Sequence, residues 1–188
     1  MTAMKPAGRL LVRVLVIATF LPSLFAARPA TPPVPRTGFR AEFLQNLDEL
    51  EQKYVSLANA VPQSRYSWRP SDGVRSVSEV YMHVASSNYY LATFLGVKPP
   101  ADSDWITEKV TDKEKVIAAM RKSFADLRTV ALSKTDAELE TKILMFGNET
   151  TERGAFITIL THLHEHLGQS IAYARMNNVV PPWSRNDQ

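Results

Sequence analysis

The sequence predicts an all-α protein with the architecture of a four-helix bundle, and three observations lead to this. Four segments carry apolar residues at spacings of three and four, the period of a helix with one buried face. Two of them are preceded by Ser or Thr with Glu three residues later, a pattern typical of a capped helix start. No alternating run is long enough to predict a sheet. Four amphipathic helices would then bury their apolar stripes against one another.

The first 26 residues are typical of a secretory signal peptide. Lys5, Arg9 and Arg13 precede or enter an apolar run, residues 10–26, which ends in small residues. Arg13 interrupts the run, so the uninterrupted part is short for a bilayer span. We expect an exported protein, periplasmic or extracellular, cleaved near Ala26 or Ala27. A retained membrane anchor is the alternative.

The basic character of the chain is largely a property of this N-terminal segment. The chain has 22 Lys plus Arg and 19 Asp plus Glu, and three of the basic residues but no acidic ones precede residue 27. The mature chain is therefore formally neutral, which gives no support to a nucleic-acid-binding surface. The chain has no cysteine, which excludes disulfides, thiolate nucleophiles and Cys-ligated zinc.

Residues 27–37 hold four prolines and predict an extended linker, followed by a single domain over residues 38–184. The first helix is predicted over residues 38–60, because one apolar stripe runs along it and Pro62 follows. Residues 63–75 predict an aromatic loop that ends in a turn at Asp72-Gly73. The stripe of the first helix comprises Phe39, Phe43, Leu47, Leu50, Tyr54 and Leu57.

The second and third helices are predicted from their caps and stripes. Ser76 and Glu79 predict a capping box for a helix that extends to about Leu95, and Thr111 and Glu114 predict one for a helix over residues 112–132. The predicted core of the second helix is Val77, Val80, Tyr81, Val84, Leu91 and Leu95, and that of the third is Val116, Ile117, Met120, Phe124, Leu127 and Ala131.

The polar stretch 133–153 separates the third helix from the fourth. Within it, residues 141–146 favour a short extended piece, and residues 148–151 are expected to form a turn. The fourth helix is predicted over residues 154–176 and ends at Asn177-Asn178. Its predicted core stripe is Phe156, Leu160, Leu163, Leu167 and Ala174.

Three of the four histidines lie close together in this last helix. His162 and His166 are four residues apart, so they share one face of the helix and can offer two imidazoles to one divalent metal. His164 points roughly 200° away from His162 at about 100° per residue, so it cannot join them. His83, in the second helix, is the candidate third ligand. A metal-free pair would have the same spacing.

The sequence lacks the motifs of two familiar enzyme classes. The zinc-protease motif needs Glu directly after the first histidine, and here that residue is Leu163. Glu165 projects away from the histidine pair, and no Gly-x-Ser-x-Gly motif marks a nucleophile. Ser86 and Ser87 follow His83 by three and four residues, where they can satisfy neighbouring polar groups.

Two motifs make the chain resemble a known family. The segment Ser76-Val77-x-Glu79-Val80-x-x-His83, preceded by Trp68-Arg69-Pro70, is similar to the first metal-ligand helix of the DinB-like four-helix-bundle proteins. The segment His162-x-x-x-His166-x-Gly168-Gln169, followed by Arg175 and Pro181-Pro182, is similar to the C-terminal signature of that family. The resemblance covers about residues 39–184. It differs where the family often has Gly after the last helix, since this chain has Asn178, a residue that also adopts left-handed conformations.

The resemblance implies a divalent metal, zinc, nickel or iron, bound by His83, His162 and His166, with Gln169 in a packing or supporting role. Three imidazoles leave a coordination position open, as catalytic sites do. One hypothesis is a metal-dependent enzyme with hydrolytic or other Lewis-acid chemistry on a small molecule. One alternative is a non-catalytic bundle that binds metal or a small ligand. Another is a thiol-dependent transferase or isomerase like related members, although low-molecular-weight thiols are cytosolic and this chain is expected to be exported. We expect a small-molecule partner, no nucleic acid and no stable membrane insertion after cleavage, and a homodimer stays open.

Overall fold

The computed structural model describes residues 34–100 and 109–184 and confirms the predicted four-helix bundle. Its long helices are α1 (Phe39–Ala60), α2 (Val77–Thr93), α3 (Lys113–Ser133) and α4 (Glu152–Met176). Short 3-10 turns occur at η1 (Gln63–Arg65), η3 (Glu138–Glu140) and η4 (Pro182–Ser184). The predicted signal peptide and most of the predicted linker lie outside the described residues. Within the described ranges, no helix has the length and apolar character needed to cross a membrane.

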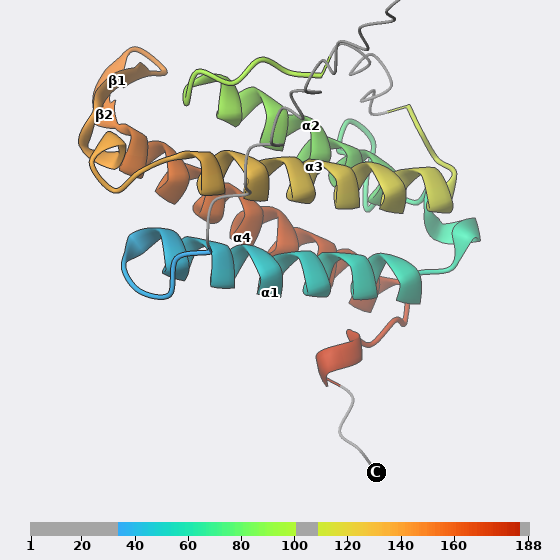
Figure 1. The fold of residues 1–188 in the computed structure, drawn as a ribbon. Helices are drawn as coiled ribbons and strands as arrows, with labels where there is room; N and C mark the ends of the chain where they lie inside the picture. Colours follow the sequence, from blue (N-terminus) through green and yellow to red (C-terminus); the bar gives the residue numbers. More distant parts are fainter. Residues whose placement is uncertain (1–33, 101–108, 185–188) are drawn as a thin grey trace, which may run out of the picture. The chain divides into compact units, whose positions relative to one another are not determined.

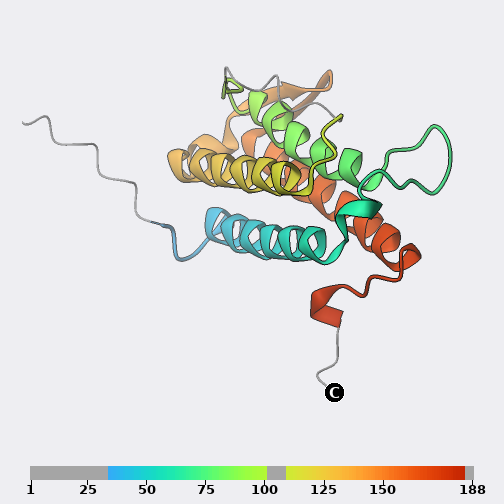
Figure 2. The same ribbon diagram turned by 90° about the vertical axis from the view of Figure 1, so that its right-hand side faces the viewer.

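The order of helices around the bundle differs from their order in the chain. Helix α1 packs against α3 and α4, and α2 packs against the same two helices, so α1 and α2 lie on opposite corners. Figures 1 and 2 show this arrangement, in which α4 runs between α1 and α2. The helix with the histidine pair is therefore a direct neighbour of the helix that carries His83.

The predicted apolar stripes form the core. All twelve core residues predicted for the second and third helices are buried, and so are Leu163 and Leu167 of α4. Phe39 and Leu160, also predicted as core, are only partly buried and pack against its edge. Tyr54 lies at the centre, with its ring against those of Phe124 and Tyr81.

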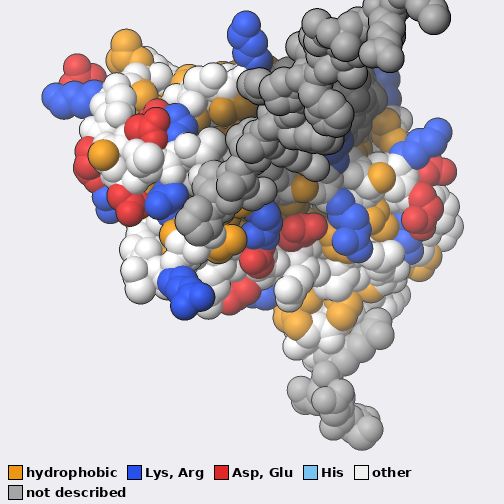
Figure 3. Space-filling model, viewed as in Figure 1, with side chains coloured by type: hydrophobic (Ala, Val, Ile, Leu, Met, Phe, Trp, Pro, Cys, Tyr) orange, Lys and Arg blue, Asp and Glu red, His pale blue; other side chains and the backbone are white. Residues whose placement is uncertain are grey.

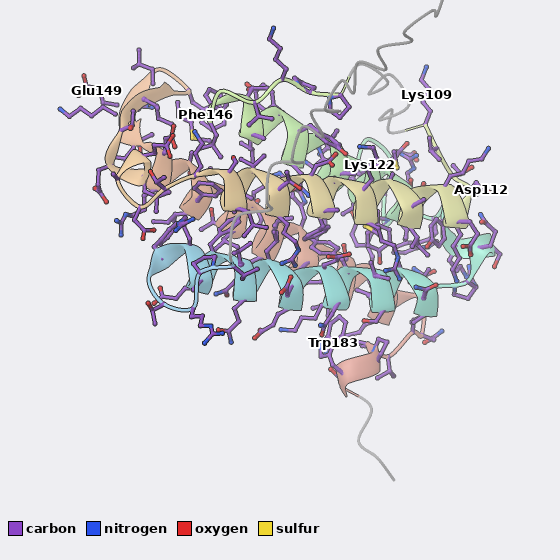
Figure 4. All side chains as sticks on the ribbon, in the orientation of Figure 1. Lys109, Asp112, Lys122, Phe146, Glu149 and Trp183 are labelled. Carbon is purple, nitrogen blue, oxygen red and sulfur yellow. The ribbon has the colours of Figure 1, made fainter. Side chains whose placement is uncertain are left out.

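One predicted helix cap is confirmed and one is wrong. The Ser76 hydroxyl accepts a hydrogen bond from the Glu79 amide, and a Glu79 carboxylate oxygen accepts one from the Ser76 amide. At α3, however, the cap is Asp112, which lies at the start of the helix (Figure 4). Its carboxylate accepts from the Lys115 amide at 2.9 Å. The helix begins at Lys113, so Thr111 lies one position too early to cap it.

The stretch between α3 and α4 contains a small antiparallel hairpin in place of the predicted turn at residues 148–151. Strand β1 (Lys142–Met145) pairs with β2 (Asn148–Thr151), and the turn is formed by Phe146 and Gly147. Both turn residues have positive φ, 53° and 82°, as a tight two-residue hairpin turn requires. The polar residues of β2 resemble a turn in sequence, but they form an edge strand in which Asn148 and Glu149 are exposed and Thr150 and Thr151 are half-buried.

The Phe146 turn is stabilised by contacts with α2. A positive φ in a bulky residue has a conformational cost of about 1–3 kcal/mol. Its ring points from the hairpin toward α2 and packs on Phe94 and Tyr90, with ring centroids 5.0 Å and 6.3 Å away (Figure 4). These aromatic contacts offset the strain and attach the hairpin to the bundle.

Charged side chains of both signs are mixed over the face of the molecule seen in Figure 3. Over the described part of that face, this mixture leaves no extended field of one sign.

A buried hydrogen bond joins α1 to α4 beside the histidines. The Tyr54 hydroxyl donates to the Leu163 carbonyl oxygen at 2.6 Å, and the Tyr54 side chain is fully buried. The bond lies one residue from His162, so it helps to fix which face of α4 is turned toward α1.

Tyr54→Phe should therefore lower the free energy of unfolding by about 1 kcal/mol, because one buried hydrogen bond is lost with little change in volume. Urea unfolding followed by circular dichroism measures the change. Tyr90→Phe is the matched control, since Tyr90 is 56% exposed, and should stay within about 0.5 kcal/mol of wild type. Equal stability of Tyr54→Phe and Tyr90→Phe would show that the bond contributes nothing.

Candidate metal centre

The three predicted histidines come together between α2 and α4. One ring nitrogen from each of His83, His162 and His166 lies within 4.8 Å of the others. The Nε2 atoms of His83 and His162 are 3.3 Å apart. Among the described residues this is the one group of three or more His, Cys, Asp or Glu side chains with such convergence.

The convergence follows from helix geometry. His162 and His166 are one turn apart on α4, so their rings lie side by side with centroids 4.5 Å apart. Helices α2 and α4 run antiparallel: Trp68, before α2, contacts Tyr173 late in α4, whereas Phe94 at the end of α2 contacts Phe146, before α4. His83 therefore reaches the pair across the helix interface.

His164 lies outside this group. It is exposed, and its Nδ1–H donates to the Leu160 carbonyl oxygen of its own helix at 2.8 Å. The helical wheel had placed it away from the pair, and the structure agrees.

A chain of side chains on α4 holds the ring of His166. Its Nδ1–H donates to Gln169 Oε1 at 2.8 Å, and Gln169 Nε2 donates to the Tyr173 hydroxyl at 3.1 Å. The Tyr173 ring stands edge-on to Trp68 at 5.6 Å. With its proton on Nδ1, His166 presents the Nε2 lone pair to the centre. Gln169 thus has the supporting role that the sequence resemblance implied.

His162 is held neutral by its surroundings. Burial, the largest cause, and the nearby charges of His166, His83 and Arg75 together lower its pKa from 6.5 to about 4. Its Nδ1 atom is buried without a hydrogen-bond partner. Arg75 is a residue near the site that sequence reasoning missed. Its position directly before the cap of the His83 helix was the available signal.

The arrangement fits a divalent cation. A tetrahedral ion with bonds of about 2.05 Å to nitrogen places two ligand atoms about 3.3 Å apart, the separation seen between His83 and His162. Two lone pairs at that distance repel unless a proton or a cation lies between them. Neutral imidazoles suit zinc, nickel and iron alike, and three of them leave a position open for water or substrate.

The described residues near the histidines supply no evident general base. Glu79 lies one turn before His83, but its carboxylate accepts hydrogen bonds from the Ser76 amide and from Arg69. These contacts, the Ser76 bond first, lower the pKa of Glu79. Glu165 is exposed, on the same side of α4 as His164.

Comparison with known proteins relates this bundle to others. A family model described as the DinB superfamily matches residues 46–170. A DinB-like protein from Bacillus cereus ATCC 10987 is similar with a TM-score of 0.66 at 18% identity, over 74% of this chain and 93% of that one. A DinB-like protein from Bacillus subtilis, YjoA, has a TM-score of 0.59 at 18% identity, over 78% and 99%. Bacillus subtilis YfiT, described as a probable metal-dependent hydrolase with an unusual four-helix bundle topology, has a TM-score of 0.61 at 17% identity, over 80% and 97%. The search of curated proteins found no match.

The lowered pKa of His162 predicts how the stability of the metal-free protein depends on pH. Between about pH 4 and pH 6.5 the unfolded chain binds more protons at this position than the folded chain. The free energy of unfolding should therefore fall as the pH is lowered from about 6.5 to about 4. His162→Gln should lose less stability over this range. Urea unfolding with a chelator at several pH values measures both, and identical losses would contradict the assignment.

Proposed function

The chain belongs to the DinB superfamily, and on that premise we propose that it is a metal-dependent hydrolase of a small molecule, with His83, His162 and His166 as the metal ligands. The observation that carries the proposal is the convergence of three imidazoles from two helices on one point. The description of YfiT as a probable metal-dependent hydrolase supports the choice of reaction.

Each residue of the centre has a separate task in this proposal. When bound, the metal would act as a Lewis acid that polarises a substrate oxygen or lowers the pKa of a water. Gln169 holds the His166 ring in the tautomer that leaves its Nε2 free to ligate. Burial keeps His162 unprotonated at neutral pH, so a proton does not compete with the metal there.

The absence of an uncommitted carboxylate near the described histidines favours a second candidate. A bundle that binds a metal or a small ligand without turnover needs the three imidazoles but no general base. A thiol-dependent transferase or isomerase needs an attacking thiol, which this cysteine-free chain would take from a small-molecule cosubstrate.

Metal content tests the centre first. Alanine substitution of His83, His162 or His166 should each strip most of the metal from protein purified without a histidine tag, because two remaining imidazoles bind a divalent ion far more weakly. Elemental analysis after loading with zinc, nickel or iron gives the stoichiometry. His164→Ala is the matched control and should retain one metal per chain. Wild type without metal, or loss of metal in His164→Ala alone, would overturn the proposed ligand set.

Turnover then separates a hydrolase from a binding bundle. Esters, amides and phosphoesters are screened with metal-loaded protein, with and without chelator. We expect hydrolysis of one class, abolished by chelator and in His83→Ala and kept in His164→Ala. Metal bound at full stoichiometry with no turnover of any class would favour the non-catalytic bundle.

We propose in addition that the protein is exported, on the basic residues and apolar run of its first 26 residues. The intact mass of protein from the native host should correspond to a chain that begins near residue 27. A mass that retains residues 1–25 would contradict cleavage.

A further inference from the structure

An aromatic cluster, formed by Tyr90, Phe94 and Phe146, lies at the end of α2 and against the hairpin. Phe146 packs on Phe94 and on Tyr90 with ring centroids 5.0 Å and 6.3 Å apart, and Tyr90 packs on Phe94 at 5.6 Å. The cluster is nevertheless open to solvent, since Phe146 is 58% exposed and Tyr90 56%. Contiguous apolar surface that stays exposed is one mark of a binding site.

The aromatic cluster lies on the face of α2 that carries His83. Tyr90 follows His83 by seven residues and Phe94 by eleven, so at about 100° per residue both lie within about 20° of it around the helix. Seven residues correspond to about 10 Å along the axis. Phe146 points from the hairpin toward α2 and contacts both rings (Figure 4). The histidine centre and the cluster are thus two parts of one face.

The stretch of helix between the histidines and the cluster is uncharged. Ser87 lies one turn after His83, and its hydroxyl oxygen is 3.5 Å from His83 Nε2. Residues 80–97, which include most of α2, contain no Lys, Arg, Asp or Glu, and neither do residues 154–164 of α4. A molecule that extends from the histidines toward the rings therefore meets no charged side chain of these two helices. Such a face suits a neutral, apolar group.

Phe146 occupies its exposed position at a conformational cost. Its φ of 53° lies in the left-handed region, and Asn would form this two-residue turn without that cost. The ring contacts with α2 offset the cost, but they leave the residue 58% exposed and do not explain why a phenylalanine stands here. A residue kept in an unfavourable conformation is a reason to look for a function. A ligand packed on the ring would complete its burial.

We propose that the aromatic cluster binds an apolar group of the substrate, preferentially an aromatic ring, while the reacting bond lies at the histidine centre. The inference rests on the proposed function. It assigns to that hydrolase neutral substrates whose apolar group is carried on a chain, about 10 Å from the reacting bond. The competing occupant is a second copy of the chain, because exposed rings also form interfaces between subunits.

Hydroxamates test the inference because the hydroxamate group ligates a metal by itself. The probes are acetohydroxamate as reference, the phenylpropionyl, phenylpentanoyl and phenylheptanoyl hydroxamates with the ring at the chain end, and the monohydroxamate of suberate, which ends in a carboxylate. Affinities for the nickel-loaded full-length mature protein are measured by calorimetry. We expect at least one of the two longer phenyl probes to bind about tenfold more tightly than acetohydroxamate. The suberate probe should show no such gain.

Phe146→Asn should remove most of this gain. Because Asn readily adopts positive φ, this change keeps the hairpin turn while it removes the ring, so a loss of affinity reports binding rather than folding. Tyr90→Ala should remove part of the gain, and Tyr90→Phe should keep it. Leu144→Thr is the matched control and should keep the full gain. Leu144 is 67% exposed in the same hairpin and lies on the opposite side of β1 from the buried Met145.

The outcomes separate this proposal from the competing occupant and from the proposed function. Light scattering gives the mass of wild type and Phe146→Asn in solution, and a wild-type dimer that becomes a monomer in Phe146→Asn would assign the cluster to an interface between chains. That result overturns the substrate site. No gain for the longer phenyl probes, a gain kept in Phe146→Asn, or an equal loss in Leu144→Thr also overturns it and leaves the metal centre standing. Failure to load metal or to bind acetohydroxamate overturns both proposals.

Discussion

The hydrogen bond from the Tyr54 hydroxyl to the Leu163 carbonyl oxygen joins α1 to α4 at the place where α4 passes from core to site. An α-helix turns about 100° per residue, so Leu163 and His162 cannot face the same way. With Leu163 buried against the core, His162 and His166 must face α2, and His164 must face solvent. Any rotation of α4 that improved one of these environments would spoil the others, so the packing of the core determines where the imidazoles point.

Placing three imidazole rings this close together costs folding free energy. Burial disfavours the charged form of His162, and three imidazolium ions at these distances would repel one another. Ring nitrogens of all three histidines nevertheless converge on a common point, and the unpartnered His162 Nδ1 is a remaining penalty. A divalent cation would convert this repulsion into bonds, which supports a metal site better than it supports a structural cluster of histidines.

Much of the fold and of the candidate site could be predicted from residue spacing, because both depend on helix periodicity. His162, His166, Gln169 and Tyr173 follow one another at spacings of four, three and four, which places them on one face of a helix, and the structure connects the last three by hydrogen bonds. The extended piece predicted over residues 141–146 is confirmed by β1, but its pairing with a second strand could not be predicted in this way. The polar second strand has no buried face to impose alternation, and Phe146 occupies a position of positive φ that sequence rules assign to Gly or Asn. The α3 cap was misplaced because Thr111 and Asp112 are both good caps, and only the observed start of the helix decides between them.

The loop before α2 contributes as much to the site as the helices do, although its sequence shows no periodicity. Carbonyl groups of Trp68 and Tyr66 accept hydrogen bonds from the amides of Val77 and Ser78, so the loop folds back over the first turn of α2 and satisfies its open donors. The same arrangement packs Trp68 against Tyr173. The Tyr173 hydroxyl accepts a hydrogen bond from the side-chain amide of Gln169, and the same amide group orients the ring of His166. The loop thus holds the ring of His166 through three contacts, while two of its arginines line an adjoining polar pocket. At 17–18% identity the solved relatives share the helical frame with this chain, and that frame places the histidines. Substrate preference would then be free to vary with the loop and the hairpin, since a change in either alters the surroundings of the site without moving the helices that hold the imidazoles.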